Sequence, residues 1–315
     1  SFLFGYSASF ILRDNSKPNR RRYLRRMLAL FLFGLAHAVF FFIGDILITY
    51  SIFGLLLFTV SRSSDRALKR WTIAAITVAV LLILVVASLA AAFPDDFSES
   101  GGLESALSTG TFAEAAIARL EALPSTLLGV FLLQGPMAFA AFVLGLRASR
   151  VKLLADPESH VDLWRKLARW GWAIGLPLQA VAAGMQIGAV ATGNSFSPGG
   201  AFGLALGFTT APILTAGYIG SIALLIHRRP LFLSFLTPAG QMSLTVYIGE
   251  SALMSFVFSA YGLGYFGQWR AFPVVLAGIA CWAVLTACAW LWMRRFKQGP
   301  LEFVMAAMTG KGGAT

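Results

Sequence analysis

The segment from Arg20 to Val60 constrains the fold more than any other part of the sequence. It begins with five arginines in seven residues and continues as an almost wholly apolar run from Met27 to Val60. As one helix, the 34 residues of this run would extend about 50 Å, whereas the hydrocarbon core of a bilayer is about 30 Å thick. We therefore expect the run to break within the membrane.

Two polar residues, His37 and Asp45, interrupt this apolar run. Gly44 tolerates turn conformations, and Asp45 is a good N-cap for a helix that begins at Ile46. We predict a helical hairpin with His37 about halfway along the first arm and Asp45 at the tip. In an unbroken helix the two residues would lie about 12 Å apart along the axis, too far for a hydrogen bond. A turn at Gly44 would bring them nearer.

The composition is that of a membrane protein. Hydrophobic residues make up 57% of the chain, charged residues only 12%, and the mean hydropathy is +0.74. These values predict an all-α fold, a polytopic transmembrane helical bundle of about eight spans plus a partial N-terminal one. The first segment, SFLFGYSASFIL, resembles the end of a longer helix. We therefore expect the N-terminus to be truncated.

The hydrophobic segments group into three regions. Residues 1–70 contain the basic loop and the His/Asp hairpin, residues 71–226 the central transmembrane helices, and residues 227–315 the C-terminal transmembrane region. After the hairpin, we predict spans at 71–93, 125–146, 170–191, 200–226, 241–260 and 271–293. Residues 94–123 are acidic and are predicted to lie on the outer side, with FAEAAIARLEAL as a membrane-surface helix or a plain loop helix.

The net charge of +11 follows membrane topology. We place 23 of the 25 lysines and arginines in alternate loops, which is the positive-inside pattern and puts the C-terminus in the cytoplasm. Arg119 and Arg270 fall on the other side. Membrane lipids, and not nucleic acid, are the partners that this distribution predicts. Cys281 and Cys288 would lie about 10 Å apart along one helix, too far to pair, and no metal-ligand spacing is present.

Ionisable residues at membrane depth are costly and point to function. His37 fits two interpretations: a neutral imidazole that bonds a neighbouring helix, or a general base or acyl acceptor in a buried cavity. Asp45 either orients that imidazole or caps the next helix. Tyr50 is a further polar residue within the same apolar run.

A second polar stripe lies in SLTVYIGES, where Ser243, Tyr247 and Glu250 share one helical face. We expect this face to point towards the protein interior. Glu250 is either functional or a protonated carboxyl group bonded to another helix.

Arg21, Arg22, Arg25 and Arg26 are neighbours at the start of the first hairpin arm. Cations at a helix N-terminus oppose the helix dipole and repel one another, so an anionic partner must offset this cost. Lipid headgroups are one such partner. The phosphates of coenzyme A are a more specific one.

Several segments together resemble the DUF418 family, the YeiB-like bacterial membrane proteins. These are SFLFGYSASF, RRYLRRMLALFLFGLAHA with GDILITYSIFG, PAGQMSLTVYIGESAL, YGLGYFGQ and MRRFKQGPLEF. The resemblance implies that His37, Asp45, Arg25 and Arg26 match the family histidine, aspartate and arginines. The chain departs from the family pattern at two places. Val246 and Glu250 stand where the family commonly has Asn and Gln, and the family's LD-x-LRG-like segment of the first helix is missing by the expected truncation.

This family is similar at a distance to heparan-α-glucosaminide N-acetyltransferase and the acyltransferase-3 proteins. The resemblance implies a bacterial inner-membrane acyltransferase that uses a cytosolic acyl-CoA and an envelope glycan or lipid acceptor, with no metal. The alternative is a transporter or channel-like protein in which His37, Asp45 and Glu250 line a proton or solute path. A third hypothesis, an interaction or assembly protein without chemistry, leaves those three groups unexplained. Under each of these hypotheses, a homodimer is a candidate assembly state.

Overall fold

The protein is all-α over the part of the chain that the structure describes. A computed structural model describes residues 1–12, 16–93, 101–229 and 231–310, and these ranges contain no strand. Six of the described helical segments are long and apolar enough to cross a membrane, and shorter apolar helices cover Phe2–Leu12, Leu47–Val60 and Ser243–Phe258. The six are Lys17–Phe40, Asp65–Ala92, Phe112–Leu133, Glu158–Ala191, Pro198–Arg228 and Ala271–Met293. The predicted transmembrane helical bundle is confirmed.

The chain forms two compact units, each built from three separate segments. The first unit comprises Ser1–Phe10, Leu57–Glu99 and Phe131–Phe232, and the second comprises Ile11–Leu56, Ser100–Val130 and Leu233–Thr315. The division into regions 1–70, 71–226 and 227–315 stays a prediction.

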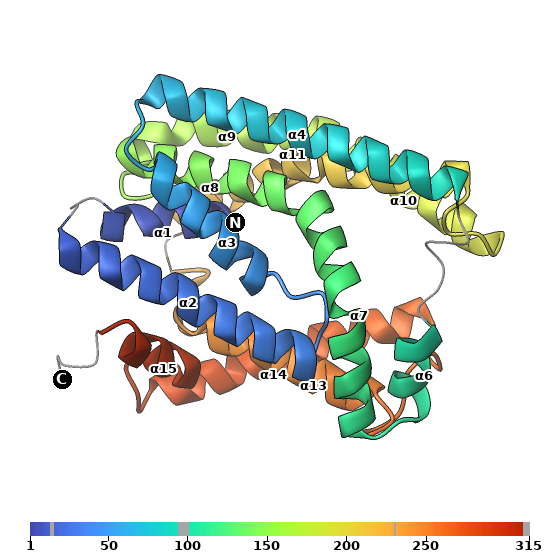
Figure 1. The fold of residues 1–315 in the computed structure, drawn as a ribbon. Helices are drawn as coiled ribbons and strands as arrows, with labels where there is room; N and C mark the ends of the chain where they lie inside the picture. The colour runs from blue at the N-terminus through green and yellow to red at the C-terminus, as the bar shows by residue number, and fades with distance from the viewer. Residues whose placement is uncertain (13–15, 94–100, 230, 311–315) are drawn as a thin grey trace. The chain divides into compact units, whose positions relative to one another are not determined.

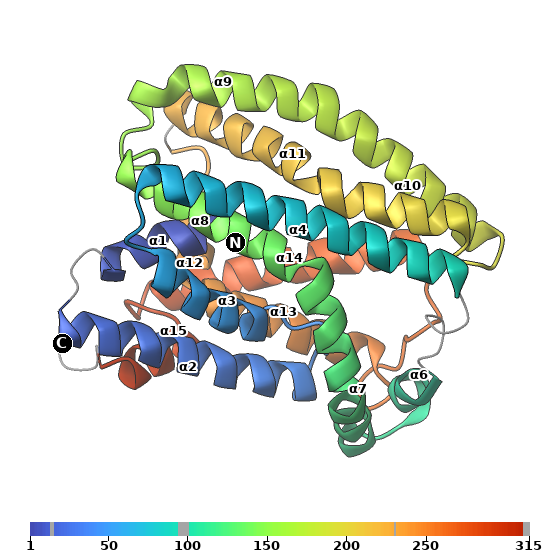
Figure 2. The same cartoon turned by 45° about the horizontal axis from the view of Figure 1, so that its top comes forward.

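The first unit is built mainly from long helices that lie side by side. Helix α4 (Asp65–Ala92) packs against α8 (Gly135–Arg150) and α11 (Pro198–Arg228). Helices α9 (Val161–Trp170) and α10 (Leu176–Ala191) also pack against α11 (Figures 1 and 2). A π-helical turn, Gly171–Gly175, joins α9 to α10. This turn packs directly on α11, because a Cβ atom at Gly171 would lie only 2.3 Å from the Cα atom of Gly217. Close backbone contact of this kind is typical of membrane helices.

The second unit contains every residue that the sequence singled out as a candidate site. Its helices include α2 (Lys17–Phe40), most of α3 (Leu47–Val60), α6 (Gly101–Thr109), most of α7 (Phe112–Leu133), α12 (Thr237–Gln241), α13 (Ser243–Phe258), α14 (Ala271–Met293) and α15 (Pro300–Met308). Helix α13 packs against α14 and α15, and α15 also contacts α2.

The prediction of one span over residues 125–146 is wrong. Helix α7 begins at Phe112, runs through Pro124 and ends at Leu133, and α8 starts after Gln134. Residues 112–123 are therefore the first half of a long apolar helix and not a separate surface or loop helix. Proline is tolerated inside a membrane helix when neighbouring groups satisfy the backbone.

Helix α15, near the C-terminus, was not predicted, and it supports the start of α13. The Glu302 carboxylate accepts hydrogen bonds from the backbone N–H groups of Leu244 and Thr245 at 2.8 and 3.1 Å, and from the Thr245 hydroxyl. A carboxylate at a helix N-terminus satisfies unpaired N–H groups and complements the helix dipole. Glu302 thereby fixes the helix that carries Tyr247.

Candidate functional site

The break in the long apolar run forms the centre of the candidate site. The His37 carbonyl accepts hydrogen bonds from the N–H groups of both Phe41 and Phe42 at 2.9 Å, and α2 ends at Phe40. The Asp45 Oδ1 atom accepts the N–H of Ile48 at 2.8 Å, which begins α3. The predicted break is therefore present. His37, however, lies in the last turn of α2, so the prediction that it lies halfway along the first arm is wrong.

The break brings the two polar residues of the hairpin into direct contact. The His37 Nδ1 atom lies 2.7 Å from Asp45 Oδ2, and the exposed fractions of the two residues are 1% and 0%. Asp45 therefore does both things that the sequence left open: it orients the imidazole and caps α3. An ionised carboxylate only accepts hydrogen bonds, so Nδ1 carries the proton when the ring is neutral. The lone pair of His37 then lies on Nε2.

The Nε2 atom of His37 is the chemically free end of this pair. It is buried and has no hydrogen-bond partner among the described residues. A buried polar atom without a partner costs about 1–3 kcal/mol, so such an atom needs an explanation. A neutral imidazole with an unoccupied Nε2 can take a proton from a hydroxyl group or accept an acyl group.

Tyr247 of α13, from a distant part of the sequence, contacts both members of the His37–Asp45 pair. Its hydroxyl group donates to Asp45 Oδ2 at 3.3 Å and accepts the N–H of Ile46 at 3.4 Å. Its ring centroid lies 4.8 Å from that of His37. The carboxylate thus has three neighbours, namely an imidazole, a phenol and a backbone amide, and its acceptor positions are well used.

The other polar candidates lie away from this pair. Ser243 and Glu250 are exposed and Tyr247 is half-buried, so the prediction that all three point into the interior is wrong for Ser243 and Glu250. The 3.6-residue period places them only roughly on one face, and of the three it is Tyr247 that packs against His37 and Asp45. Tyr50 is half-buried in the first turn of α3.

Arg119 of α7 is a polar residue that sequence reasoning placed in an outer segment, whereas the structure buries it with 3% exposure. Its guanidinium donates to the Phe40 carbonyl at 3.1 Å, to Ser255 Oγ at 3.1 Å and to the Tyr261 hydroxyl at 3.3 Å. The missed signal is a period of four residues: Ala115, Arg119 and Leu123 are all buried on one face of α7.

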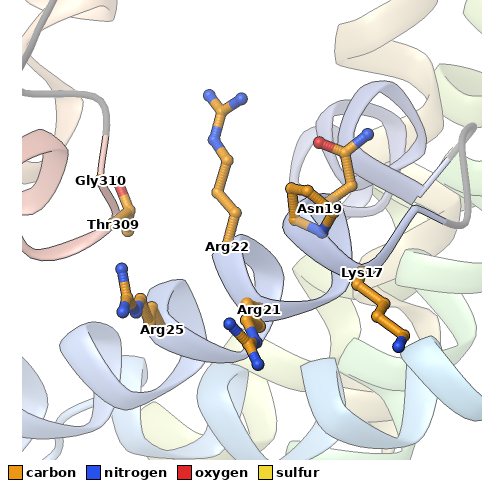
Figure 3. Close-up of a pocket in the computed structure, with 8 residues that line it drawn as sticks. Lys17, Asn19, Arg21, Arg22, Arg25, Thr309 and Gly310 are labelled. Carbon is orange, nitrogen blue, oxygen red and sulfur yellow. The ribbon is translucent and has the colours of Figure 1, made fainter.

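A basic cavity of about 500 Å³ lies at the other end of α2. It is lined by Lys17, Pro18, Asn19, Arg21, Arg22, Arg25, Thr309 and Gly310. Figure 3 shows Arg25 extending towards Thr309 and Gly310, while Arg21, Arg22 and Lys17 spread from the first turns of α2. Arg26, which the sequence grouped with these residues, is half-buried and does not line the cavity. No carboxylate lines it, so its electrostatic field favours an anion.

The described residues contain no group of three His, Cys, Asp or Glu side chains that could hold a metal ion. Cys281 is buried and Cys288 is exposed, and both are free thiols. The side chains that the site brings together are an imidazole, a carboxylate, a phenol and, at the end of α2, a guanidinium.

The apolar helices and the buried polar pair define a multi-pass helical membrane protein. The family described as "Protein of unknown function (DUF418)" matches residues 148–311, more than half of the chain. The chain belongs to the DUF418 family, which confirms the resemblance seen in its segments. The matched region includes α13 with Tyr247 and α15 with Glu302.

Two relatives extend the comparison. The uncharacterized protein YxaH of Bacillus subtilis (strain 168) is 27% identical over 338 residues, which cover 98% of this chain and 77% of YxaH. An uncharacterized 39.9 kDa protein in the amylase 3' region of Bacillus acidopullulyticus is 32% identical over 109 residues, 34% of this chain and 31% of that protein. No solved structure matches the chain significantly.

Proposed function

We propose that this protein is an acyltransferase of the bacterial inner membrane. It moves an acyl group, such as acetyl, from a cytosolic acyl-CoA to a hydroxyl group of an envelope glycan or lipid. The observation that carries this proposal is the buried His37–Asp45 pair, in which Nδ1 is held at 2.7 Å and Nε2 has no partner among the described residues. An imidazole oriented by a carboxylate is a recurrent general base in acyl transfer.

The reaction needs only protein side chains and the two substrates. The Nε2 atom of His37 removes the proton from the acceptor hydroxyl as its oxygen attacks the thioester carbonyl. The carbon–sulfur bond then breaks, and the imidazolium returns the proton to the leaving thiolate. An ester and free coenzyme A result. Asp45 stabilises the imidazolium while it exists, and Tyr247 holds the carboxylate in place.

The basic cavity supports coenzyme A as the carrier of the acyl group. Its four cationic lining residues, Lys17, Arg21, Arg22 and Arg25, suit the phosphate groups of that molecule. Arg25 precedes His37 by twelve residues on one helix, a separation of about 18 Å along the axis. The thioester of acyl-CoA is likewise separated from its phosphates by a long flexible arm. The cavity and the imidazole are thus spaced for the two ends of one substrate.

The alternative is a transporter with a proton or solute path through His37, Asp45 and Glu250. Glu250 is exposed, whereas the other two are buried, so the three do not form one buried path. The geometry therefore favours the acyltransferase.

The test is transfer of labelled acetyl from acetyl-CoA by the purified protein in liposomes that contain bacterial envelope lipids and glycans. The wild type should form a labelled ester, and His37→Ala should abolish it while the protein stays folded. His227→Ala, which changes an exposed histidine, should keep full activity. Full transfer by a folded His37→Ala variant would overturn the mechanism. Flux driven by a pH gradient without a labelled product would instead establish the transporter.

A further inference from the structure

Arg119 is a buried cation without a carboxylate partner among the residues that the structure describes. The carboxylates that contact a basic side chain there are Asp45, next to His37, Asp65, next to Arg147, and Asp162, next to Arg165. The Arg119 guanidinium instead binds three neutral oxygen atoms. Removing a guanidinium charge from water costs several kcal/mol unless its hydrogen bonds compensate. These three oxygen atoms lie at the end of α2, on α13 and in the segment after α13, so Arg119 connects these parts of the chain.

The first oxygen belongs to the end of α2. In a continued α-helix, the Phe40 carbonyl would accept the N–H of Gly44. Arg119 Nη1 donates to this carbonyl at 3.1 Å instead, only three residues after His37. A cation also complements the negative end of the helix dipole. Arg119 therefore stabilises the end of α2 at the point where the chain must leave the helix and return Asp45 to His37.

The other two oxygens belong to α13 and the segment after it. Arg119 Nη2 donates to Ser255 Oγ at 3.1 Å and to the Tyr261 hydroxyl at 3.3 Å, and these two hydroxyl groups also bond each other. Ser255 follows Tyr247 on α13 by eight residues, about 12 Å along the axis. One guanidinium thus binds the helix that carries His37 and the helix that carries Tyr247.

We propose that Arg119 is a positioning residue for the His37–Asp45 pair. It ends α2 after His37 and fixes α13 beside it, so that Asp45 meets both the imidazole and the Tyr247 hydroxyl. Its effect on catalysis rests on the proposed function, whereas its effect on the geometry of the pair does not. The hydrogen bonds of Arg119 described above reach neither His37 nor Asp45, so it acts through the backbone of α2 and through α13.

The test uses the fact that the chain has three histidines. Replacing the two others, in the His160→Gln/His227→Gln protein, leaves His37 as the sole imidazole. Nitrogen NMR of ¹⁵N-histidine then reports its tautomer, and diethyl pyrocarbonate reports how often Nε2 is reached. In this background we expect one tautomer, protonated on Nδ1, and slow modification.

Arg119→Met keeps much of the side-chain length but removes every donor. We expect mixed tautomers of His37 and modification about tenfold faster or more, the change that loss of one charged hydrogen bond produces. Arg119→Lys, which keeps the charge but replaces the forked guanidinium by a single ammonium group, should lie between. Arg270→Met changes an exposed arginine of the same unit and should alter neither signal. An unchanged tautomer and modification rate in folded Arg119→Met would overturn the proposal.

If Arg119→Met does not fold, the double variant Ser255→Ala/Tyr261→Phe decides. It keeps the arginine but removes its contacts with α13 and the following segment, and it too should speed the modification of His37. An unchanged rate would overturn the proposal.

If the wild type transfers acyl groups, Arg119→Met should lower kcat and leave the KM for acyl-CoA unchanged, because the basic cavity lies at the other end of α2. A wild type without transfer activity would reject the proposed function but not this role of Arg119.

Discussion

The Oδ2 atom of Asp45 lies 2.7 Å from Nδ1 of His37, and both side chains are buried. The two residues are eight positions apart, so in a straight helix they would be separated by about 12 Å along the axis. The six non-helical residues 41–46 turn the chain after α2, so that the Asp45 side chain reaches His37. The same carboxylate also caps α3 through Ile48, so helix formation and the orientation of the imidazole depend on one side chain.

Asp45→Asn should separate these two roles. Its amide oxygen can still accept the N–H of Ile48, so the free energy of unfolding should change by less than about 1 kcal/mol beyond the loss of the hydrogen bond from His37 to the carboxylate. Its NH₂ group donates to Nδ1, which moves the histidine proton to Nε2 and removes the base. We expect strongly reduced acyl transfer, though less complete a loss than in His37→Ala. Asp45→Ala loses the cap as well and should also be less stable by about 0.5–2 kcal/mol. Equal activity of Asp45→Asn and wild type would contradict the orienting role.

Tyr247→Phe should weaken the hold on the Asp45 carboxylate without leaving a cavity beside His37. The ring stays against His37, but Asp45 loses a donor and Ile46 loses an acceptor. We expect a loss of stability of about 0.5–1.5 kcal/mol, measured by thermal unfolding in detergent, and a partial loss of transfer. Tyr265→Phe, at an exposed tyrosine of the same unit, is the control and should behave as wild type. A Tyr247→Phe protein with unchanged stability would show that its hydroxyl contacts contribute nothing.

Gly34→Ala should disrupt the site from within α2. A Cβ atom there would lie 2.5 Å from Asp45 Oδ1 and 2.7 Å from the Ile48 nitrogen, inside the hydrogen bond that caps α3. We expect destabilisation of about 1–3 kcal/mol and displacement of Asp45 from His37, visible in the histidine NMR spectrum. Gly129→Ala is the matched control, because a Cβ atom at that helical position has open space. It should be neutral or stabilising by up to about 1 kcal/mol. Similar melting curves for the two alanine variants would contradict this packing.

The Arg22→Gln/Arg25→Gln double variant should lose affinity for acyl-CoA. Each lost charged hydrogen bond costs about 1.5–3 kcal/mol, so Kd measured by calorimetry should rise at least tenfold. Addition of salt should weaken wild-type binding in the same direction. Arg66→Gln, at an exposed arginine of the first unit, should bind as the wild type does. Unchanged affinity in the folded double variant would leave lipid headgroups as the partners of these arginines.

The charge distribution predicts that the C-terminus is cytoplasmic and that residues 94–111, which precede α7, lie on the outer side. Reporter fusions at Ser100 and at Gly310 should therefore report opposite compartments. The same compartment for both would contradict this topology. Outer accessibility of Gly310 would also place the basic cavity away from cytosolic acyl-CoA, since Gly310 lines that cavity.

The hairpin was predictable because its causes are local. A run too long for one span, a glycine beside a capping aspartate and a single histidine are all features of neighbouring residues, and they located the break correctly. The sequence alone left open whether Asp45 caps α3 or orients His37. That choice depended on the path of residues 41–46, which no local propensity fixes, and the structure shows that Asp45 does both.

Tyr247 and Arg119 mark the limit of such reasoning. Tyr247 meets Asp45 across 202 residues, and helical period alone could not separate it from Glu250, which is exposed. Arg119 lies in a segment with many acidic residues, and this charge predicted that the segment lies on the outer side. Burial of its guanidinium depends on a carbonyl at the end of α2 and on hydroxyl groups of α13 and the segment after it. No pattern within α7 reveals these partners.

The absent side chain of Gly34 has a consequence beyond this one protein. Because Asp45 Oδ1 and the Ile48 nitrogen occupy the space where a Cβ atom would stand, only glycine admits the aspartate to its place beside His37. The three positions form the spacing Gly-x2-His-x7-Asp. This spacing is a signature for recognising the same buried pair in other membrane proteins, and a chain that has the histidine and aspartate but a larger residue at the first position should arrange them differently.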